Sequence, residues 1–404
     1  MREKWIKRKS FDKRGVTVVL YVLPDYYPEF HCRAGACEDT CCAGWQIVIE
    51  EQSLKRYKAY RGPFRRRLFL SVRWKKGSFR QDKEKRCAFL NDKNLCDMYV
   101  ELGPDSLCRT CRLYPRHIEE YENVREVSLS VSCPEAARLL LTRQEAVSFR
   151  RFYREKEESY EEFDELLYSV LTDCRTGMLE ILQKRSLSLK LRCVLVAGLA
   201  NDVQKRFDQG KLFSCRSLLE RLCGAVRTSS GEEIDSHPWL FAAENRMADR
   251  KRENFQWIRQ MFAFLSELEV LKEDWPLWLE EIRERLYRSG QAAYERTERE
   301  FLSWLEKDGR DWTIPFEQLL VYFFFVYFCG AVYDGEILAS AQLGIVHVWL
   351  IREMLMAVWL RNGKTLCIED LTELVCRYSR ELEHSDINQK RMEKKMSRCR
   401  LPWL

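Results

Sequence analysis

The residues best suited to chemistry are the cysteines in the first third of the chain. Nine of the 17 cysteines lie before residue 134. They are Cys32, Cys37, Cys41, Cys42, Cys87, Cys96, Cys108, Cys111 and Cys133. Thiolates gathered this densely are soft, anionic ligands that suit an iron–sulfur cluster or a zinc ion. The sequence therefore predicts a cysteine-ligated metal centre in this region.

The spacing of these cysteines allows one metal site or two. Cys108 and Cys111 form a Cys-x-x-Cys step, in which two thiolates converge on one ion. The adjacent side chains of Cys41 and Cys42 diverge, so each can join a different cluster, or one can ligate while the other packs or reacts. Nine thiols make one four-cysteine site with five left over, or two such sites with one left over. Spacing alone does not separate iron–sulfur from zinc, and the Cys-x3-Cys-x2-Cys loop of radical adenosylmethionine enzymes is absent from the sequence.

Disulfides are the structural alternative, and the N-terminal sequence argues against them. Basic residues 1–14 precede the apolar residues 16–23, as in a secretory signal peptide, but Pro24-Asp25-Tyr26 follows instead of a small-residue cleavage site. We therefore predict a β-strand at residues 16–22. The other cysteines are scattered, as small hydrophobic residues are in a reducing compartment. A cytoplasmic location is expected.

The composition limits the classes of partner. The 404 residues are enough for two or three domains, and 46% of them are apolar. The 68 Lys and Arg exceed the 62 Asp and Glu by only six, which does not favour a dedicated nucleic-acid binder. Basic runs occur at residues 65–67, 73–76 and 390–400. We interpret them as solvated surface, with a docking patch for an acidic protein as the alternative.

Two apolar runs raise the question of a membrane span. Residues 319–333 are too few to cross a bilayer, which takes about 20 residues. Residues 338–360 carry His347, Arg352 and Glu353. Both runs are therefore predicted to be buried core helices, and no membrane span is expected.

The remaining pattern predicts an α+β fold that is mostly α. Short β-rich runs occur at residues 46–49 and 124–131, and Pro134 suits the first turn of a helix. From about residue 145 onward, apolar residues recur at helical spacing. Examples are Phe149, Phe152 and Tyr153, and then Met178, Ile181 and Leu182. Helix breaks are expected at residues 227–238, near 290, at 313–315 and at 362–363. We predict a cysteine-rich domain at residues 1–141, with short strands, and a mainly α-helical domain at 142–404.

Several short motifs together match a known family. They are Phe30-x-Cys32-x4-Cys37-x-Asp39-Thr40-Cys41-Cys42-x-Gly44-Trp45, Cys87-Ala88-Phe89-Leu90, Cys96, Cys108-Arg109-x-Cys111-x3-Pro115, Ser132-Cys133-Pro134-Glu135-Ala136-Ala137-Arg138 and Glu383-His384-Ser385-x2-Asn388. The sequence resembles the flagellin lysine-N-methylase family, called FliB. Its N-terminal part is similar to the YkgJ-type zinc- or iron-chelating domain. The likeness is specific mainly over residues 24–141.

This resemblance implies an S-adenosylmethionine-dependent protein-lysine methyltransferase that acts on flagellin. It also implies an iron–sulfur cluster, of the 4Fe-4S type, with zinc as the alternative. The sequence itself contains no Gly-x-Gly-x-x-Gly loop, so a Rossmann-type site for the methyl donor is not expected. Our hypothesis is that a cluster iron with an open position chelates the amino and carboxylate groups of the donor.

Methylation of lysine also requires a neutral amine. Deprotonating an ε-ammonium of pKa about 10.4 at pH 7 costs about 4.6 kcal/mol, so a base or an apolar pocket must help. Glu383 and His384 are the candidate catalytic residues, against the simpler interpretation of a surface acid and a hydrogen-bonded histidine. His31 and His117 flank cysteine motifs, but packing or hydrogen bonding is favoured over metal ligation. Trp45 is expected to cover the metal centre.

Two other functions remain open at this point. One is a non-catalytic zinc- or iron-binding protein whose helical part binds a partner. The other is an electron-transfer or redox-sensing protein. Flagellin is the expected protein substrate under the leading hypothesis, and neither a nucleic acid nor a membrane is an expected partner.

Overall fold

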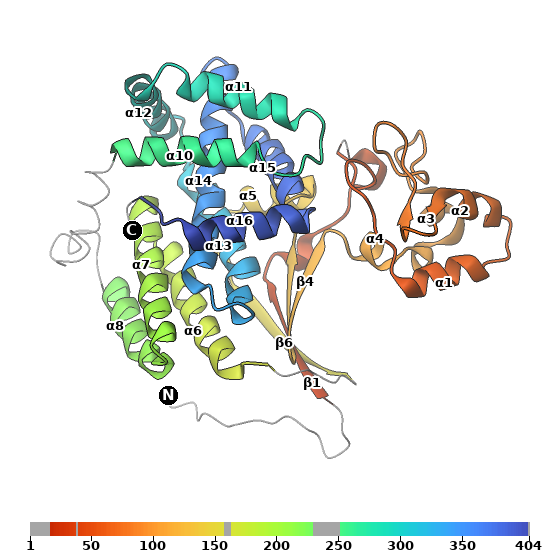
Figure 1. Ribbon diagram of the computed structural model, residues 1–404, viewed down its shortest axis with the longest axis horizontal. Helices are drawn as coiled ribbons and strands as arrows, with labels where there is room; N and C mark the ends of the chain where they lie inside the picture. Colours follow the sequence, from red (N-terminus) through yellow and green to blue (C-terminus); the bar gives the residue numbers. More distant parts are fainter. Residues whose placement is uncertain (1–16, 38, 157–162, 229–250, 403–404) are drawn as a thin grey trace.

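The computed structural model describes residues 17–37, 39–156, 163–228 and 251–402. A small lobe that contains five of the nine N-terminal cysteines stands beside a larger body, in which helices pack on a sheet (Figure 1). We call the small part, residues 42–113, the cysteine lobe. The prediction of an α+β fold that is mostly α is confirmed.

The sheet has four strands in the order β4-β5-β1-β6. Its strands are β1 (Thr17–Pro24), β4 (Arg116–Tyr121), β5 (Val124–Leu129) and β6 (Phe149–Lys156). Strand β1 runs parallel to β5 and antiparallel to β6. The strands predicted at residues 16–22 and 124–131 are therefore confirmed within one to a few residues.

The predicted helical pattern is wrong for residues 149–156, which form β6. Phe152 pairs with Tyr21 of β1, and their rings stack with centroids 5.2 Å apart. Phe149 packs on Phe325, with ring centroids 4.4 Å apart. The spacing of Phe149, Phe152 and Tyr153 is that of a helix, so pairing with the edge of β1 decides the conformation.

The strand predicted at residues 46–49 is also wrong. Val48 forms only an isolated bridge with Ser78. Ile47 and Ile49 are buried while Val48 is 60% exposed, so the side chains do alternate. The neighbouring strands β2 (Val72–Arg73) and β3 (Ser78–Phe79) are two residues long and form a separate hairpin. Residues 46–49 therefore do not join a longer sheet with β2 and β3.

The cysteine lobe has its own small core. Its helices are α1 (Glu51–Ala59), α2 (Arg65–Ser71), α3 (Asp97–Leu102) and α4 (Arg109–Leu113). The core includes Phe79, Phe89 and Cys108, with Cys42, Cys96 and Cys111 packed against it. A second, much larger core fills the body and includes Cys133. The domain boundary at residue 141 stays a prediction.

The body consists of helices on and around the sheet. They are α5 (Pro134–Leu141), α6 (Glu165–Leu182), α7 (Leu189–Asp208), α8 (Cys215–Thr228), α10 (Lys251–Leu265), α11 (Trp275–Tyr287), α12 (Gln291–Lys307), α13 (Thr313–Tyr327), α14 (Ile337–Arg361), α15 (Ile368–Glu383) and α16 (Asp386–Arg398). Helix α5 begins at Pro134 as predicted. The break near Gly290 separates α11 from α12, and α14 ends before Asn362. Most of the break predicted at 227–238 lies outside the described residues.

Helices α13 and α14 are the centre of the body. By length and composition, Thr313–Val332 and Ile337–Arg361 are apolar enough to cross a membrane, but their most apolar windows are 89% and 83% buried in the protein. Met178, Ile181 and Leu182 of α6 are buried beside them. Both apolar runs are therefore core helices, as predicted.

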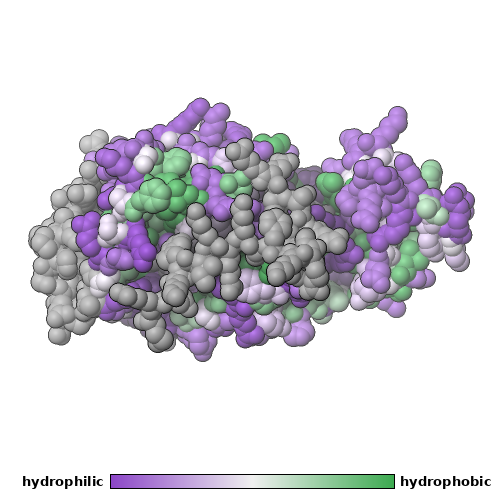
Figure 2. Space-filling view, turned by 90° about the horizontal axis from the view of Figure 1, so that it is seen from below, coloured by the Kyte–Doolittle hydropathy of each residue, from purple (hydrophilic) through white to green (hydrophobic). Residues whose placement is uncertain are grey.

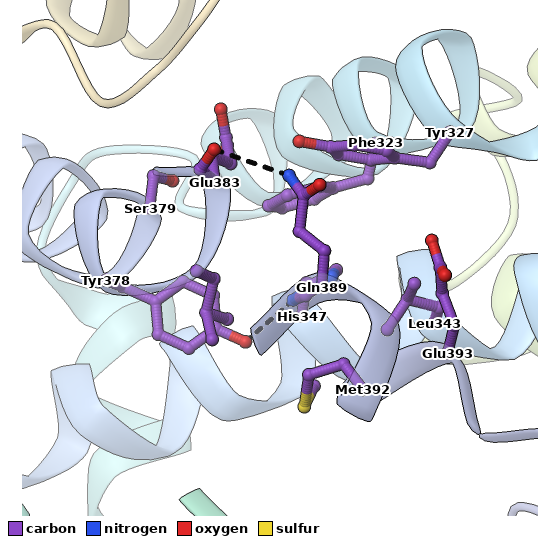
Figure 3. Close-up of a pocket in the computed structure, with 11 residues that line it drawn as sticks. Phe323, Tyr327, Leu343, His347, Tyr378, Ser379, Glu383, Gln389, Met392 and Glu393 are labelled. Carbon is purple, nitrogen blue, oxygen red and sulfur yellow. Dashed lines mark hydrogen bonds between the residues drawn. The ribbon is translucent and has the colours of Figure 1, made fainter. Parts of the chain in front are cut away.

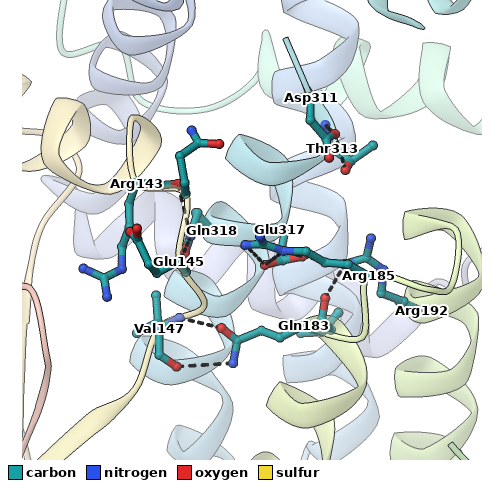
Figure 4. Close-up of polar contacts among 12 residues, drawn as sticks. Arg143, Glu145, Val147, Gln183, Arg185, Arg192, Asp311, Thr313, Glu317 and Gln318 are labelled. Carbon is teal, nitrogen blue, oxygen red and sulfur yellow. Dashed lines mark hydrogen bonds and ion pairs between the residues drawn. The ribbon is translucent and has the colours of Figure 1, made fainter.

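Buried ion pairs join α13 to α7 and to the loop that precedes it, and a hydrogen bond fastens the loop between α5 and β6 to the same helix (Figure 4). The fully buried Glu317 of α13 binds Arg185 at 2.9 Å and Arg192 at 2.7 Å. Its neighbour Gln318 donates to the carbonyl of Glu145 at 2.8 Å. Each buried charge is thus paired, which burial requires.

Candidate active site

The nine N-terminal cysteines separate into two groups. Electrostatic interaction links the thiol of Cys41 with those of Cys32 and Cys133, and links Cys133 with Cys37. We call Cys32, Cys37, Cys41 and Cys133 the junction group. The thiol of Cys87 interacts with those of Cys42, Cys96 and Cys108, and that of Cys111 with Cys42 and Cys87. We call Cys42, Cys87, Cys96, Cys108 and Cys111 the lobe group.

The adjacent Cys41 and Cys42 therefore belong to different groups. Their thiols also hydrogen bond to each other, which raises the pKa of Cys41 and lowers the pKa of Cys42 to about 7. The same interaction raises the pKa of Cys111 and lowers that of Cys108. Each pair thus favours one thiolate and one thiol. All 17 cysteines, which all lie in the described ranges, are free thiols.

The thiols are the right type of ligand for a metal, but they are not arranged around a single ion. Among the described residues, no three His, Cys, Asp or Glu side chains converge as ligands of one metal ion would. Their softness and their gathering in sets of four and five still match the chemistry of zinc or an iron–sulfur cluster. Which cysteines ligate, and whether the metal is iron or zinc, stays a prediction.

His384 lies at the junction between the cysteine lobe and the body. It follows the last residue of α15, and its Nε2 hydrogen bonds with Ser132 Oγ at 3.0 Å. Its ring lies 4.5 Å from that of Trp45, whose Nε1 donates to the carbonyl of Cys41 at 2.8 Å. His384 is therefore next to the backbone that carries two thiols of the junction group. Burial, together with the charge of Arg380, lowers the pKa of His384 to about 3.

Glu383 points away from His384, into the body. Its Oε2 accepts hydrogen bonds from Ser130 Oγ at 2.6 Å and from Tyr322 OH at 3.0 Å. Its Oε1 is buried and has no hydrogen-bond partner among the described residues. Burial raises the pKa of Glu383, although these hydrogen bonds oppose the shift. The carboxyl group is thus a better proton acceptor than an exposed glutamate.

Two serines connect the predicted catalytic residues. Ser132 Oγ lies 2.6 Å from Ser130 Oγ, so an unbroken chain of hydrogen bonds runs from His384 through both serines to Glu383. Tyr114 OH also contacts Ser132 Oγ, at 3.1 Å. Sequence reasoning missed the role of both hydroxyl groups. The only signal was that Ser132 directly precedes Cys133 in the motif.

Figure 3 shows the side of Glu383 that faces a small cavity in the body. Gln389 lies over this acid, and His347 hydrogen bonds with Tyr378 OH at 2.7 Å on the opposite wall. The cavity has a volume of about 20 Å³, enough for about one water molecule. The cavity is therefore too small for a lysine side chain or a methyl donor.

An ion pair missed by the sequence fastens the junction. The Arg380 guanidinium pairs with the Asp39 carboxylate, donates to the Asp39 carbonyl at 2.7 Å and donates to the Ser132 carbonyl at 3.0 Å. Arg380 precedes His384 by one helical turn, so both lie on the same face of α15. Cys376, another turn earlier, interacts electrostatically with Cys133 and Cys37. The four-residue spacing of Cys376, Arg380 and His384 was the sequence signal that could have revealed Cys376 and Arg380.

The motif that begins at Glu383 also holds the loop between α10 and α11 near the junction. Asn388 Oδ1 accepts from the Glu269 amide at 2.8 Å, and its Nδ2 donates to the carbonyls of Glu269 and Glu381. The Glu381 carboxylate accepts from the amides of Leu271 and Lys272. The Lys272 ammonium lies 3.7 Å from the Asp39 carboxylate. The motif therefore positions the loop that contacts the junction.

The two histidines near cysteine motifs make hydrogen bonds instead of joining a thiol group. His31 is exposed, and its Nδ1 lies 2.9 Å from the carbonyl of Glu29. His117 Nε2 lies 2.6 Å from the Glu119 carboxylate. Burial lowers the pKa of His117, but the bond with Glu119 outweighs it and raises the pKa overall. These contacts agree with the hydrogen-bonding role favoured for both.

Comparison with known proteins identifies the family. Residues 175–401 match the FliB lysine N-methylase C-terminal domain. The chain is 29% identical over 133 residues to the flagellar biosynthetic protein FliU of Salmonella muenchen, which covers 31% of this chain and 79% of that protein. It is equally similar to the lysine-N-methylases of Salmonella typhimurium and Salmonella choleraesuis, of which the alignment spans 33%. No solved structure matches. Because the family model covers more than half of the sequence, this chain belongs to the FliB lysine N-methylase family.

Proposed function

We propose that this protein is a protein-lysine methyltransferase that moves a methyl group from S-adenosylmethionine to lysine ε-amines of flagellin in the cytoplasm. Family membership supports lysine methylation, and the names of the relatives support a flagellar substrate. The observation that carries the proposal is the hydrogen-bonded chain from His384 to Glu383, which begins beside the junction group. A lysine methyltransferase needs such a proton acceptor, whereas a structural metal site does not.

The chain of hydrogen bonds can remove the proton from the substrate ammonium. The depressed pKa of His384 keeps its ring neutral at pH 7, and its Nδ1 has no hydrogen bond in the described structure. Nδ1 accepts the proton while Nε2 passes one to Ser132. Ser132 passes its own proton to Ser130, and Ser130 passes its own to Glu383, whose raised pKa favours retaining it. The acid thus stores the proton away from the reacting amine.

Methyl transfer follows once the amine is neutral. Its nitrogen forms a bond to the methyl carbon as the carbon–sulfur bond of the donor breaks, and S-adenosylhomocysteine leaves. The thiols of the junction group would hold an iron–sulfur cluster, which supplies a Lewis-acidic iron for the amino and carboxylate groups of the donor. The lobe group would hold a second metal ion, zinc or iron, that stabilises the fold of the lobe. Trp45 and Tyr114 shield His384 from water on the junction side.

The test is a methylation assay with anaerobically purified protein, isotopically labelled donor and flagellin, read by mass spectrometry of the lysines. Glu383→Gln and His384→Asn preserve shape but remove proton-accepting power. We expect methylation to fall by about 10²–10⁴-fold while metal content and donor binding stay unchanged. Wild-type turnover in both variants would remove these residues from the mechanism.

The same preparation separates the two other functions. Colourless protein with stoichiometric zinc and no donor binding would indicate a zinc-binding interaction protein. Brown protein that contains iron and sulfide but does not bind the donor would indicate electron transfer or redox sensing. Only iron, sulfide and donor binding together support the methylase.

A further inference from the structure

The excess positive charge of the protein is concentrated in one segment of the cysteine lobe. Residues 51–76 contain ten Lys or Arg and one Glu, although the whole chain has a net charge of only +6. This segment forms α1, α2 and β2. The rest of the chain therefore carries a small negative net charge. The excess charge belongs to a local surface and not to the protein as a whole.

Exposed apolar side chains lie among these charges. On α2, Arg65 precedes Phe69 by four residues and Arg66 precedes Leu70 by four, so each pair shares a face of the helix. Phe69 is 61% and Leu70 is 60% exposed. The ring of Trp74 packs 5.4 Å from that of Phe69, and Lys58 Nζ lies 5.7 Å from the Trp74 ring. We call Lys58, Arg65, Arg66, Phe69, Leu70 and Trp74 the basic–aromatic patch.

The charges of this patch are not used within the protein. Lys55 pairs with Glu51, and Arg67 pairs with Asp97. By contrast, Lys58, Arg65 and Arg66 form no ion pair with the residues that the structure describes, and all three are exposed. The hydrophobic and charged groups of the patch thus remain available to a partner.

We propose that the basic–aromatic patch docks an acidic segment of the protein substrate that also carries apolar side chains. Carboxylates would pair with Arg65 and Arg66 in bidentate geometry, and an apolar side chain would cover Phe69 and Leu70. This inference rests on the proposed function, because it gives the methylase a second contact with its substrate. Helix α2 lies on the outer side of the lobe in Figure 1, whereas the candidate active site lies where the lobe meets the body. Docking would therefore anchor the substrate at a distance from the lysine.

The side chains of the patch favour a protein over a nucleic acid or a membrane. Single-stranded nucleic acid stacks on open aromatic faces, but Lys58 and Phe69 already contact the Trp74 ring. Binding of a membrane surface scales with the apolar area that is buried in it, whereas the seven-residue α2 offers only Phe69 and Leu70 as exposed large hydrophobic side chains. In the view of Figure 2 the lobe, at the right, is predominantly hydrophilic and has only small hydrophobic areas. A small apolar area rimmed by charge is typical of a specific protein contact.

The experiment compares two patch variants with a matched control. Arg65→Glu/Arg66→Glu reverses two charges at the start of α2, where glutamate suits the helix dipole, so the fold should be retained. Phe69→Ser/Leu70→Ser removes the exposed apolar groups. Lys394→Glu/Arg398→Glu makes the same charge change at exposed positions of α16. Binding to purified flagellin is measured at low and high salt, together with kcat and KM for flagellin and for a short flagellin peptide that contains one target lysine.

We expect each patch variant to raise the KM for flagellin and the Kd for flagellin by about tenfold, with kcat unchanged. The control variant and the short peptide should show wild-type values. Salt should weaken flagellin binding by every protein that keeps Arg65 and Arg66, and should have little effect on the Arg65→Glu/Arg66→Glu variant. Unchanged flagellin binding in both patch variants would overturn the proposal. Binding of anionic vesicles or single-stranded RNA that depends on the patch, with flagellin unaffected, would also overturn it. If the wild type methylates neither substrate, the proposed function fails, but flagellin binding still decides whether the patch docks it.

Discussion

Ser132 offers the sharpest test of the hydrogen-bonded chain. Ser132→Ala removes a fully buried hydroxyl that contacts His384, Tyr114 and Ser130. Ser130 keeps its bond to Glu383, so the change leaves two buried groups, the His384 ring and the Tyr114 hydroxyl, without this partner. Each unsatisfied group costs about 1–3 kcal/mol, so for two groups we expect a total loss of about 2–6 kcal/mol of unfolding free energy. The methylation rate should fall by about 10²–10⁴-fold because the proton path is broken.

Ser128→Ala is the matched control for this prediction. Ser128 lies four residues earlier on β5 and is also buried, but its hydroxyl has no hydrogen-bond partner in the described structure. Its removal should change the unfolding free energy by less than about 0.5 kcal/mol and leave turnover intact. Urea unfolding and single-turnover methylation measure the two effects separately.

A double variant distinguishes a shared path from a general loss of structure. If Ser132 and Glu383 act on the same proton, Ser132→Ala/Glu383→Gln should be no slower than the slower single variant. Multiplied losses in the double variant, or a wild-type rate in Ser132→Ala, would refute the chain of proton transfers.

Three further predictions follow from other parts of the structure. Cys41→Ala should remove the metal of the junction group, and Cys42→Ala should remove the metal of the lobe group. Analysis of iron, sulfide and zinc should therefore show different losses in the two variants. Identical losses would mean one shared site. Phe324→Asp places a charge where a ring is 1% exposed. The variant loses about 1.5–3 kcal/mol of hydrophobic stabilisation, to which the cost of desolvating the carboxylate is added, and it should be insoluble or unfolded. A soluble variant that is helical by circular dichroism would contradict this. Burial raises the pKa of Glu353 from 4.5 to about 7, so its contribution to the unfolding free energy is present at acidic pH and is lost as pH rises from 4.5 to 7, by about 3 kcal/mol. Glu353→Gln should remove this pH dependence from urea unfolding measured across that range. An unchanged pH dependence would exclude this residue as its source.

The local conformation of much of the chain could be predicted from the sequence. Pro134 marks the start of α5 because its missing amide hydrogen costs nothing in the first turn. The apolar runs of α13 and α14 identify core helices, since no polar face remains for solvent. The prediction for β6 failed because Phe149, Phe152 and Tyr153 have helical spacing, and only pairing with the edge of β1 selects the strand.

The candidate site was predicted in its residue types but not in its connections. Density and spacing singled out the nine cysteines as metal ligands, which stays a prediction. Cys41 and Cys42 interact with different thiol groups, which was among the arrangements considered, but their thiols also meet each other. The junction group depends on Cys133, which the fold of the body places near the loop that carries Cys41. Glu383 and His384 were singled out as candidates, yet their link through Ser130 and Ser132 was not.

The sequence by itself determined the chemistry that this protein has available: a dense set of soft thiol ligands, a neighbouring acid and histidine, and apolar helices long enough to form a core. Only the tertiary structure decided which of these groups meet. Ser130 and Glu383 are 253 positions apart, yet they lie 2.6 Å from each other. Helical and strand periods report which face of a segment is buried, but contacts between distant segments depend on how the faces pack. The Arg380–Asp39 ion pair and the chain from His384 to Glu383 arise in this way, from the docking of α15 against the first strands and loops.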